Sequence, residues 1–304
     1  MSENKKYVIT SGCSFTANNG TKNHFPYYGN RSWSYFFEDI VNKDNVIVEN
    51  VALPSVGNFT IYMNCMNMVQ TLLNRGVKPK DIKVFVQWSG LFRVTKYVPE
   101  GASRALPMHD MSPKASADML SDGSVLTNFV TGMNGEYWQD FVKYYTTGQA
   151  IIDTLNEILK LQWFLKSLNI KYKFFTGWDI FTCLKGDDST PIEKFTISKG
   201  SKSIGRVTPA QFENTKYENI NNSRLVDVYN PALLFWNMID FKNFWFFENE
   251  KVKYGGLIQW IQNNFEDYKL WYRSFPRDVH PSNDAAEKFA EKIILPLYKQ
   301  METE

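Results

Sequence analysis

Cysteine, long basic blocks and long apolar runs are all scarce in this chain of 304 residues. The three cysteines, Cys13, Cys65 and Cys183, are widely spaced and contain no Cys-x-x-Cys pair, which argues against a disulfide framework or a zinc site. Lys and Arg number 34 against 32 Asp and Glu, so the net charge of +2 exerts little attraction on nucleic acid. The sequence also lacks a glycine-rich phosphate loop, which disfavours a nucleotide-binding function.

No segment is long and apolar enough to span a bilayer. The best candidate, residues 233–247, is interrupted by Asp240 and Lys242. The first six residues read Met-Ser-Glu-Asn-Lys-Lys and have no apolar core of the kind found in signal peptides. These absences predict a soluble protein without a membrane partner, and the cytoplasm is one location that we expect.

Aromatic residues, in contrast, are abundant. They make up 16% of the chain, in a composition that is 43% hydrophobic and 22% charged and therefore typical of a folded protein. Many fall late, as in the run 241–247. Such residues can pack a large core or line a sugar-binding or protein-binding surface. We favour the core, because aromatic side chains contribute most of their energy through burial.

Strand-like and helix-like segments alternate along the chain. Four strands are predicted at 6–10, 46–51, 82–88 and 170–175. Helical spacing of apolar residues predicts helices at about 33–41, 59–73 and 151–168. A final helix, capped by Ser282, presents Ala286, Phe289, Ile293 and Leu297 on one face. This alternation predicts an α/β fold with a parallel central sheet between helical layers.

Two stretches interrupt the alternation, at about 92–146 and 180–250. The first has no clear periodicity, and the second contains a polar, turn-rich part at 185–222. Unstructured loops of this length are uncommon in compact domains. We therefore interpret both as insertions at the carboxyl edge of the sheet, within a single domain that covers residues 1–304.

A glycine and a serine follow the first strand directly. Residues 12–16 read Gly-Cys-Ser-Phe-Thr, and Gly12 permits a tight turn before Ser14. Ligands of open α/β sheets bind beyond the carboxyl ends of the strands, so Ser14 is a candidate nucleophile. A lone Gly-x-Ser is also common at helix N-termini, and a simple N-cap is the alternative.

An acid and a histidine precede the final helix. Residues 278–281 read Asp-Val-His-Pro, which we expect to form a loop. A histidine with a carboxylate nearby can be oriented as a general base, so Asp278 and His280 are candidates for that pair. A surface histidine beside a capping motif is the alternative. The chain has only two other histidines, His24 and His109.

Taken together, the order of these motifs resembles the SGNH (GDSL-like) family of serine hydrolases. Residues 12–16 resemble the first block of that family, 50–58 the second and 278–281 the fifth, while 84–89 occupies the position of the third. The resemblance spans nearly the whole chain but does not cover the insertions. It implies a flavodoxin-like three-layer α/β/α fold and ester hydrolysis through an acyl-serine intermediate, without a metal or organic cofactor.

The resemblance also implies roles for individual residues. Ser14 is the nucleophile, His280 its base, and Asp278 the group that orients His280, as in a triad recognised by roles. The oxyanion hole is formed by the backbone of Ser14 and by the second and third blocks, at positions matching Gly57, Asn58 and Ser89. A small ester, such as an acylated carbohydrate, is the substrate that we expect.

Three positions depart from the family pattern. Cys13 replaces the usual Asp, and the glycine of the second block aligns with Ser55 or with Gly57, which we prefer. Ser89 stands where the third block normally supplies an Asn side chain to the oxyanion. Loss of one donor costs on the order of 100-fold in rate. Asn58 or Gln87 could substitute for the missing donor, or activity could be weak or absent.

The remaining polar candidates are less specific. His24 belongs to a loop that should border the site, His109 has no assigned role, and Arg93 could bind an anionic substrate group or be a solvated loop residue. The degenerate third block and the insertions motivate a second function class, a non-catalytic binding or virion-type structural module. The long insertions and the Asn-rich, aromatic-rich character of the sequence also resemble hydrolase-like proteins of large tailed bacteriophages.

Overall fold

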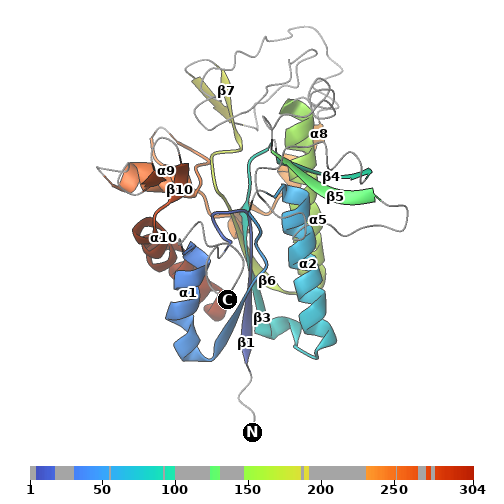
Figure 1. Ribbon diagram of the computed structural model, residues 1–304, viewed down its shortest axis with the longest axis vertical. Helices are drawn as coiled ribbons and strands as arrows, with labels where there is room; N and C mark the ends of the chain where they lie inside the picture. Colours follow the sequence, from blue (N-terminus) through green and yellow to red (C-terminus); the bar gives the residue numbers. More distant parts are fainter. Residues whose placement is uncertain are drawn as a thin grey trace.

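A parallel four-stranded sheet lies at the centre of the protein. The computed structural model describes residues 5–17, 31–54, 56–91, 93–99, 124–130, 147–185, 188–191, 231–250, 252–265, 272–274 and 278–304. The sheet contains β1 (Lys6–Ser11), β2 (Val46–Asn50), β3 (Ile82–Trp88) and β6 (Lys171–Thr176), in the order β2-β1-β3-β6. All four strands are parallel, so their carboxyl ends meet at one edge (Figure 1). The four strands predicted from the sequence are confirmed to within a residue or two.

The strand order is flavodoxin-like, as predicted. In that order a fifth strand would lie beside β6. Here Phe244 occupies this place through a single parallel bridge to Phe174, and the N–H of Trp245 donates to the Phe174 carbonyl at 2.7 Å. The segment 231–250, which lies inside the predicted second insertion, therefore contributes to the central layer.

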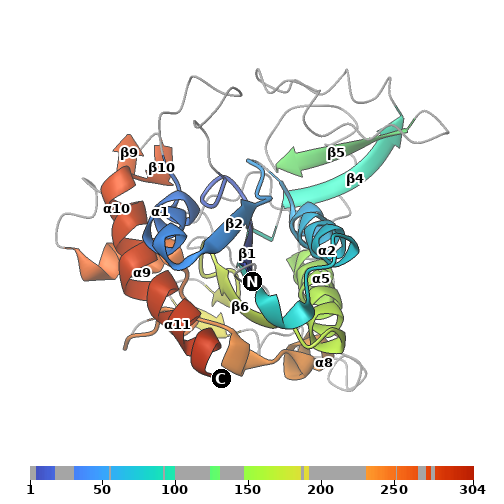
Figure 2. The same cartoon turned by 90° about the horizontal axis from the view of Figure 1, so that it is seen from below.

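Helices cover both faces of the sheet, giving three layers (Figures 1 and 2). One layer contains α1 (Trp33–Val41), α9 (Leu257–Asn264), α10 (Asn283–Phe289) and α11 (Leu295–Thr303). The other contains α2 (Asn58–Asn74), α5 (Thr147–Ser167) and α8 (Pro231–Met238). Every residue of β3 is buried, as expected for a strand covered on both faces. In the part of the chain that the structure describes, no helix is long and apolar enough to cross a membrane.

Aromatic side chains fill much of the core. On one face, the Phe175 ring packs edge-on against Trp33 and also contacts Phe289 from the last helical segment. On the other, Phe174 packs against Trp88 and Phe244. The expectation that aromatic residues serve the core is confirmed for these positions.

In the described part of the chain, three pairs of short antiparallel strands accompany the sheet. Pairing joins β4 (Arg93–Pro99) to β5 (Ser124–Val130) and β7 (Thr182–Lys185) to β8 (Asp188–Pro191), both within the predicted insertions. A third pairs β9 (Tyr272–Ser274) with β10 (Asp278–Pro281). Residues 278–281 were predicted to form a loop, and that prediction is wrong at the level of the backbone. Pairing with the neighbouring β9 segment, which has no sequence signal of its own, makes them a strand.

The last helical segment contains a π-helical turn, Ala290–Ile294, between α10 and α11. The prediction of one continuous face is correct for Ala286 and Phe289 but not beyond them. Ile293 and Leu297 are only half-buried, and the buried face continues instead through the side chains of Ile294, Tyr298 and Met301. A wide turn inserts an extra residue into the helical repeat and so shifts the face that meets the core.

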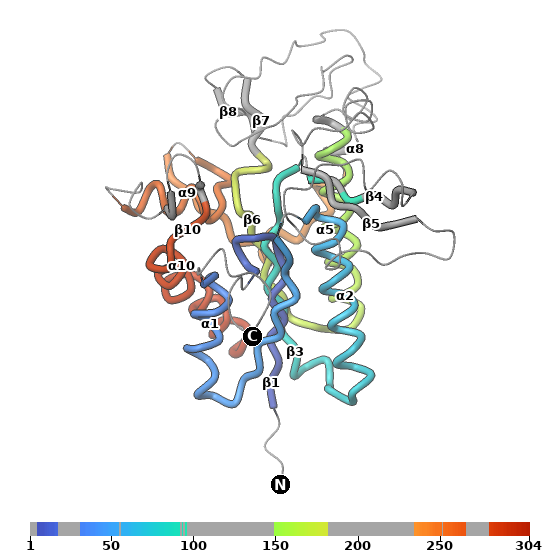
Figure 3. The backbone as a smooth tube through the Cα atoms, viewed as in Figure 1, coloured from blue at the N-terminus to red at the C-terminus, as the bar shows by residue number. Residues whose placement is uncertain are grey.

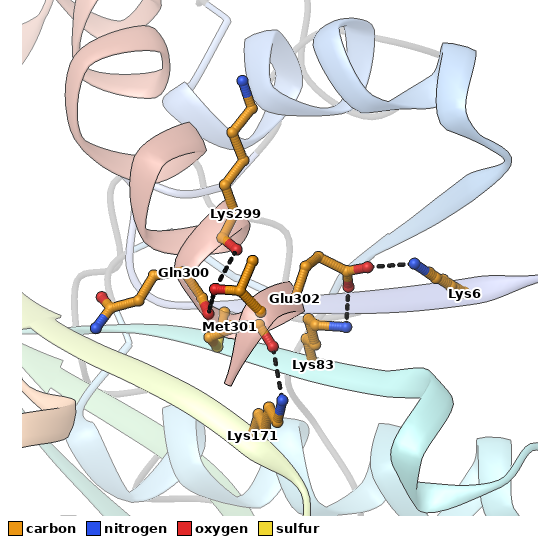
Figure 4. Close-up of polar contacts among 8 residues, drawn as sticks. Lys6, Lys83, Lys171, Lys299, Gln300, Met301 and Glu302 are labelled. Carbon is orange, nitrogen blue, oxygen red and sulfur yellow. Dashed lines mark hydrogen bonds and ion pairs between the residues drawn. The ribbon is translucent and has the colours of Figure 1, made fainter.

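The C-terminal end of the chain lies near the amino ends of the central strands (Figure 3), and side-chain contacts tie the final turn of α11 to three of them (Figure 4). The Glu302 carboxylate pairs with Lys6 of β1 and Lys83 of β3, and the Lys171 ammonium of β6 donates to the Met301 carbonyl at 2.9 Å. Burial alone would raise the pKa of the Glu302 carboxyl. Hydrogen bonds and positive charge from the two lysines outweigh this effect and lower the pKa below its ordinary value.

Candidate active site

A tight turn, residues 12–17, follows β1 at the carboxyl edge of the sheet. The N–H groups of Thr16 and Ala17 both donate to the Cys13 carbonyl at 2.9 Å. A Cβ atom on Gly12 would lie 2.4 Å from the Thr16 hydroxyl oxygen, so a side chain at residue 12 does not fit without movement. Ser14 is partly exposed, whereas every other residue of the turn is buried. The fold therefore presents one hydroxyl, that of Ser14, from an otherwise closed turn.

A buried network of hydrogen bonds connects this turn to β3 and α1. The Thr16 hydroxyl donates to the Gln87 side-chain oxygen at 3.1 Å and accepts from the Trp33 indole at 3.0 Å. The Cys13 thiol donates to the same Gln87 oxygen at 3.3 Å, and the Gln87 amide nitrogen donates to the Trp88 carbonyl at 2.7 Å. Gln87, considered above as a substitute oxyanion donor, is thus engaged at both ends of its amide. Thr16 was not singled out in the sequence, because its role depends on partners from two other elements.

The His280 side chain reaches the exposed serine. Its Nε2 atom lies 2.7 Å from the Ser14 Oγ atom, although the two residues are 266 positions apart. His280 belongs to β10, directly before α10, whose N-cap Ser282 accepts a hydrogen bond from the Ala285 N–H at 3.3 Å. The Phe15 ring meets the imidazole edge-on, with 5.1 Å between ring centroids. Strand, cap and ring together fix where the imidazole stands.

Other predicted residues are only partly described. The backbone of Asp278 pairs with Ser274 in the β9–β10 hairpin, but its side chain lies outside the described part of the chain. Ser55, His24 and His109 lie outside the described residues altogether.

The second and third blocks meet through a side-chain clamp. Asn58, at the start of α2, accepts from the Ser89 N–H at 2.7 Å and donates to the Ser89 carbonyl at 3.2 Å. Its second amide hydrogen is directed to the Thr154 hydroxyl, also at 3.2 Å. An amide nitrogen carries two hydrogens, so in this arrangement Asn58 has no N–H left for an oxyanion. Its contacts make it the group that fixes the Ser89 backbone.

Gly57 and Arg93 are in close backbone contact beside this clamp. A Cβ atom on Gly57 would lie 2.4 Å from the Arg93 carbonyl oxygen, so this approach depends on glycine. The Arg93 guanidinium lies over the Trp178 ring at 5.1 Å, and Trp178 contacts Phe15 with 4.7 Å between centroids. No motif in the sequence singles out Trp178. Its position two residues after β6, at the same edge as Ser14, was the available signal.

A cavity of about 410 Å³ lies elsewhere, at the opposite edge of the sheet. It is lined by the start of β6 and the last turn of α11, including Lys171, Lys173 and Gln300. It lies at the amino end of the strand and takes no part in the arrangement around Ser14. Among the residues that the structure describes, no group of three or more His, Cys, Asp or Glu side chains is placed to hold a metal ion.

Comparisons with known proteins add a distant similarity to solved structures. No protein-family model and no curated protein matches the sequence. Among solved structures, the chain is similar to the crystal structure of protein YxiM from Bacillus subtilis, with 11% sequence identity and a TM-score of 0.42. The similarity covers 98% of this chain and 57% of that chain, so the protein spans just over half the length of this neighbour. At this level the comparison assigns neither a family nor an activity.

Proposed function

We propose that the protein is a serine ester hydrolase in which Ser14 is the nucleophile and His280 its general base. The observation that carries the proposal is the 2.7 Å contact between Ser14 Oγ and His280 Nε2, formed by the partly exposed residue of a buried turn. A nucleophile and a base within hydrogen-bonding distance are the signature of this chemistry. The order of sequence motifs, which resembles that of SGNH hydrolases, supports the same assignment.

The reaction follows from these two groups. His280 Nε2 removes the hydroxyl proton as Ser14 Oγ attacks the ester carbonyl carbon, forming a tetrahedral intermediate with a negative oxygen. The intermediate collapses, the bond to the alcohol oxygen breaks, and His280 returns the proton to the leaving alcohol. A water molecule, deprotonated by His280, then hydrolyses the acyl-serine by the same route and releases the acid. His280 acts in its neutral form, because only a neutral imidazole accepts the proton.

Stabilisation of the oxyanion is assigned to backbone N–H groups of Ser14 and Gly57, with the Ser89 hydroxyl as the side-chain donor. The Ser89 hydroxyl is buried and has no hydrogen-bond partner among the described residues, so its proton is not already donated within that part of the protein. Asn58 is then a positioning residue that acts through the Ser89 backbone. One well-placed oxyanion donor is worth about 100- to 1000-fold in rate.

Asp278 and the substrate are assigned on the resemblance alone. Asp278 is proposed to orient His280, and the substrate to be a small ester such as an acylated carbohydrate. Fold-level similarity is a weak guide to the substrate, so simple aryl esters such as nitrophenyl acetate serve as general probes of activity.

A serine-directed fluorophosphonate tests the proposal. Labelling is expected on Ser14, identified by peptide mass spectrometry, and it should disappear in Ser14→Ala and fall strongly in His280→Ala. Ser167→Ala is the matched control, since Ser167 is an exposed serine at the end of α5. Hydrolysis of nitrophenyl acetate should follow the same pattern, and the two losses should not add, because the pair acts as one unit. Unchanged turnover in folded Ser14→Ala would refute the mechanism.

One observation favours a second candidate, a catalytically weak or inactive module that binds a ligand or serves in a virion. Both amide hydrogens of Asn58 are used within the protein, and no Asn stands at residue 89. Under this alternative, well-folded protein remains unlabelled by the fluorophosphonate and does not hydrolyse aryl acetates.

A further inference from the structure

Buried polar atoms without partners gather at the carboxyl edge of the sheet. In the described part of the chain, most of the buried side-chain atoms that lack a hydrogen bond belong to residues at the ends of β3 and β6 or just beyond them: Trp88, Ser89, Arg93, Thr176 and Trp178. Leaving such a group unsatisfied destabilises the folded protein, and more so when the group is charged. Native proteins contain few of them, so a concentration beside one site calls for an explanation.

The charged member of this group is Arg93. Its Nη1 atom is buried and makes no hydrogen bond, and no carboxylate of the described residues forms an ion pair with it. The guanidinium is held instead by the Trp178 ring, 5.1 Å from its carbon atom. The indole N–H of Trp178 is likewise buried and unpartnered. Arg93 as a whole is only partly buried, so its guanidinium has one desolvated nitrogen without an anion, and a ligand that supplies the anion would satisfy it.

Ring contacts connect Arg93 to the proposed catalytic pair. The Trp178 and Phe15 rings lie 4.7 Å apart, and the Phe15 and His280 rings lie 5.1 Å apart, both measured between ring centroids. On its backbone side, Arg93 lies against Gly57, one of the proposed oxyanion donors. The guanidinium is therefore at the same edge of the sheet as Ser14 and His280, and it lies over the Trp178 indole.

We propose that Arg93 and Trp178 form a subsite for an anionic group of the substrate, so that the preferred esters carry a carboxylate or phosphate close to the scissile bond. The planar guanidinium matches the two oxygens of such a group, and stacking on an aromatic ring pre-orients it. The inference rests on the proposed function, since it specifies the substrate class of the same site.

Matched aryl acetates test the subsite. Acetyl transfer from 4-acetoxybenzoate, which is anionic, is compared with that from its neutral methyl ester by following release of the phenol. The wild-type protein should favour the anionic ester by about tenfold or more in kcat/KM, mainly through a lower KM, and Arg93→Gln should abolish this preference. Arg93→Lys keeps the positive charge but loses the paired N–H groups of the guanidinium, so it should retain part of the preference for the anionic ester. Arg75→Gln, a change at an exposed arginine after α2, is the control and should retain all of it.

The outcomes separate the two proposals. Absence of a preference in active wild-type protein, or a preference unchanged in folded Arg93→Gln and Arg93→Lys, overturns the subsite and leaves the hydrolase intact. If neither ester is cleaved, the hydrolase fails, and binding of 4-acetoxybenzoate to Ser14→Ala by calorimetry still tests the subsite. Binding that is lost on adding Arg93→Gln supports it, and absence of binding overturns it. Replacing the carboxylate ester with 4-acetoxyphenyl phosphate shows which anion is preferred.

Discussion

Substitution of Asn58 distinguishes a clamp from a catalytic donor. The side chain is almost fully buried, and its amide makes three hydrogen bonds, two to the Ser89 backbone and one to Thr154. Asn58→Ala removes all three and leaves the N–H and carbonyl of Ser89 without partners. At about 1–3 kcal/mol for each unsatisfied group, the free energy of unfolding should fall by about 2–6 kcal/mol. Thr154→Val removes only one acceptor and should cost about 1 kcal/mol.

Urea unfolding measured alongside hydrolysis of an activated ester provides the assay. If Asn58 positions Ser89, Asn58→Ala should lower stability and kcat together, with little change in the m-value or in KM. If Asn58 donates directly to the oxyanion, kcat should fall by about 100-fold or more while stability changes little. A folded Asn58→Ala protein within about 1 kcal/mol of wild type would therefore refute the clamp.

Three further predictions concern residues at the carboxyl edge of the sheet and at its amino edge. Ser89→Ala should lower turnover of an activated ester and Ser89→Asn, with its longer donor, should raise it. Two folded variants with wild-type kcat would remove Ser89 from the oxyanion hole. Gly12→Ala should lower the free energy of unfolding by about 2 kcal/mol or more, because the added Cβ would overlap the Thr16 hydroxyl. Gly90→Ala is the control, since its added Cβ meets nothing within 4 Å, and it should fold normally in the same melting experiment. Glu302→Gln should lose stability, on the order of 1–3 kcal/mol at pH 7. Because the pKa of Glu302 is lowered, its contribution to the free energy of unfolding is present above the ordinary carboxyl pKa and is lost as the pH falls through the folded-state pKa. The stabilities of the variant and the wild type should therefore become equal in acid. Glu291→Gln, which removes an exposed pair with Lys288, is the control.

The sheet could be predicted because its strands are short apolar runs separated by helical repeats. β3 is the clearest case, since burial on both faces requires nearly every residue to suit the core. The same reasoning located α2, whose spacing of apolar residues ends at Gly76, where the backbone adopts a positive φ of 84°. Local pattern and tertiary environment agree at these positions.

Features that depend on pairing between distant segments could not be predicted. The strand character of 278–281 requires β9, and the Asn58–Ser89 clamp requires three side-chain contacts between elements that no periodicity connects. The candidate pair was different, because the order of motifs along the chain indicated that Ser14 and His280 meet. Their roles, and that of Asp278, remain predictions.

The wide turn at 290–294 has a consequence for insertions and deletions. One helical segment, 283–303, starts three residues after His280, and its last turn pairs with lysines at the other edge of the sheet. The π-helical turn absorbs one extra residue, so the halves on either side of it both keep a buried face toward the core. Removing one residue from the regular turns of α10 or α11 would instead rotate the final turn by about 100° relative to the first. Glu302 and the start of the helix could then no longer both meet their partners, so the length of this segment is constrained even where its surface is polar.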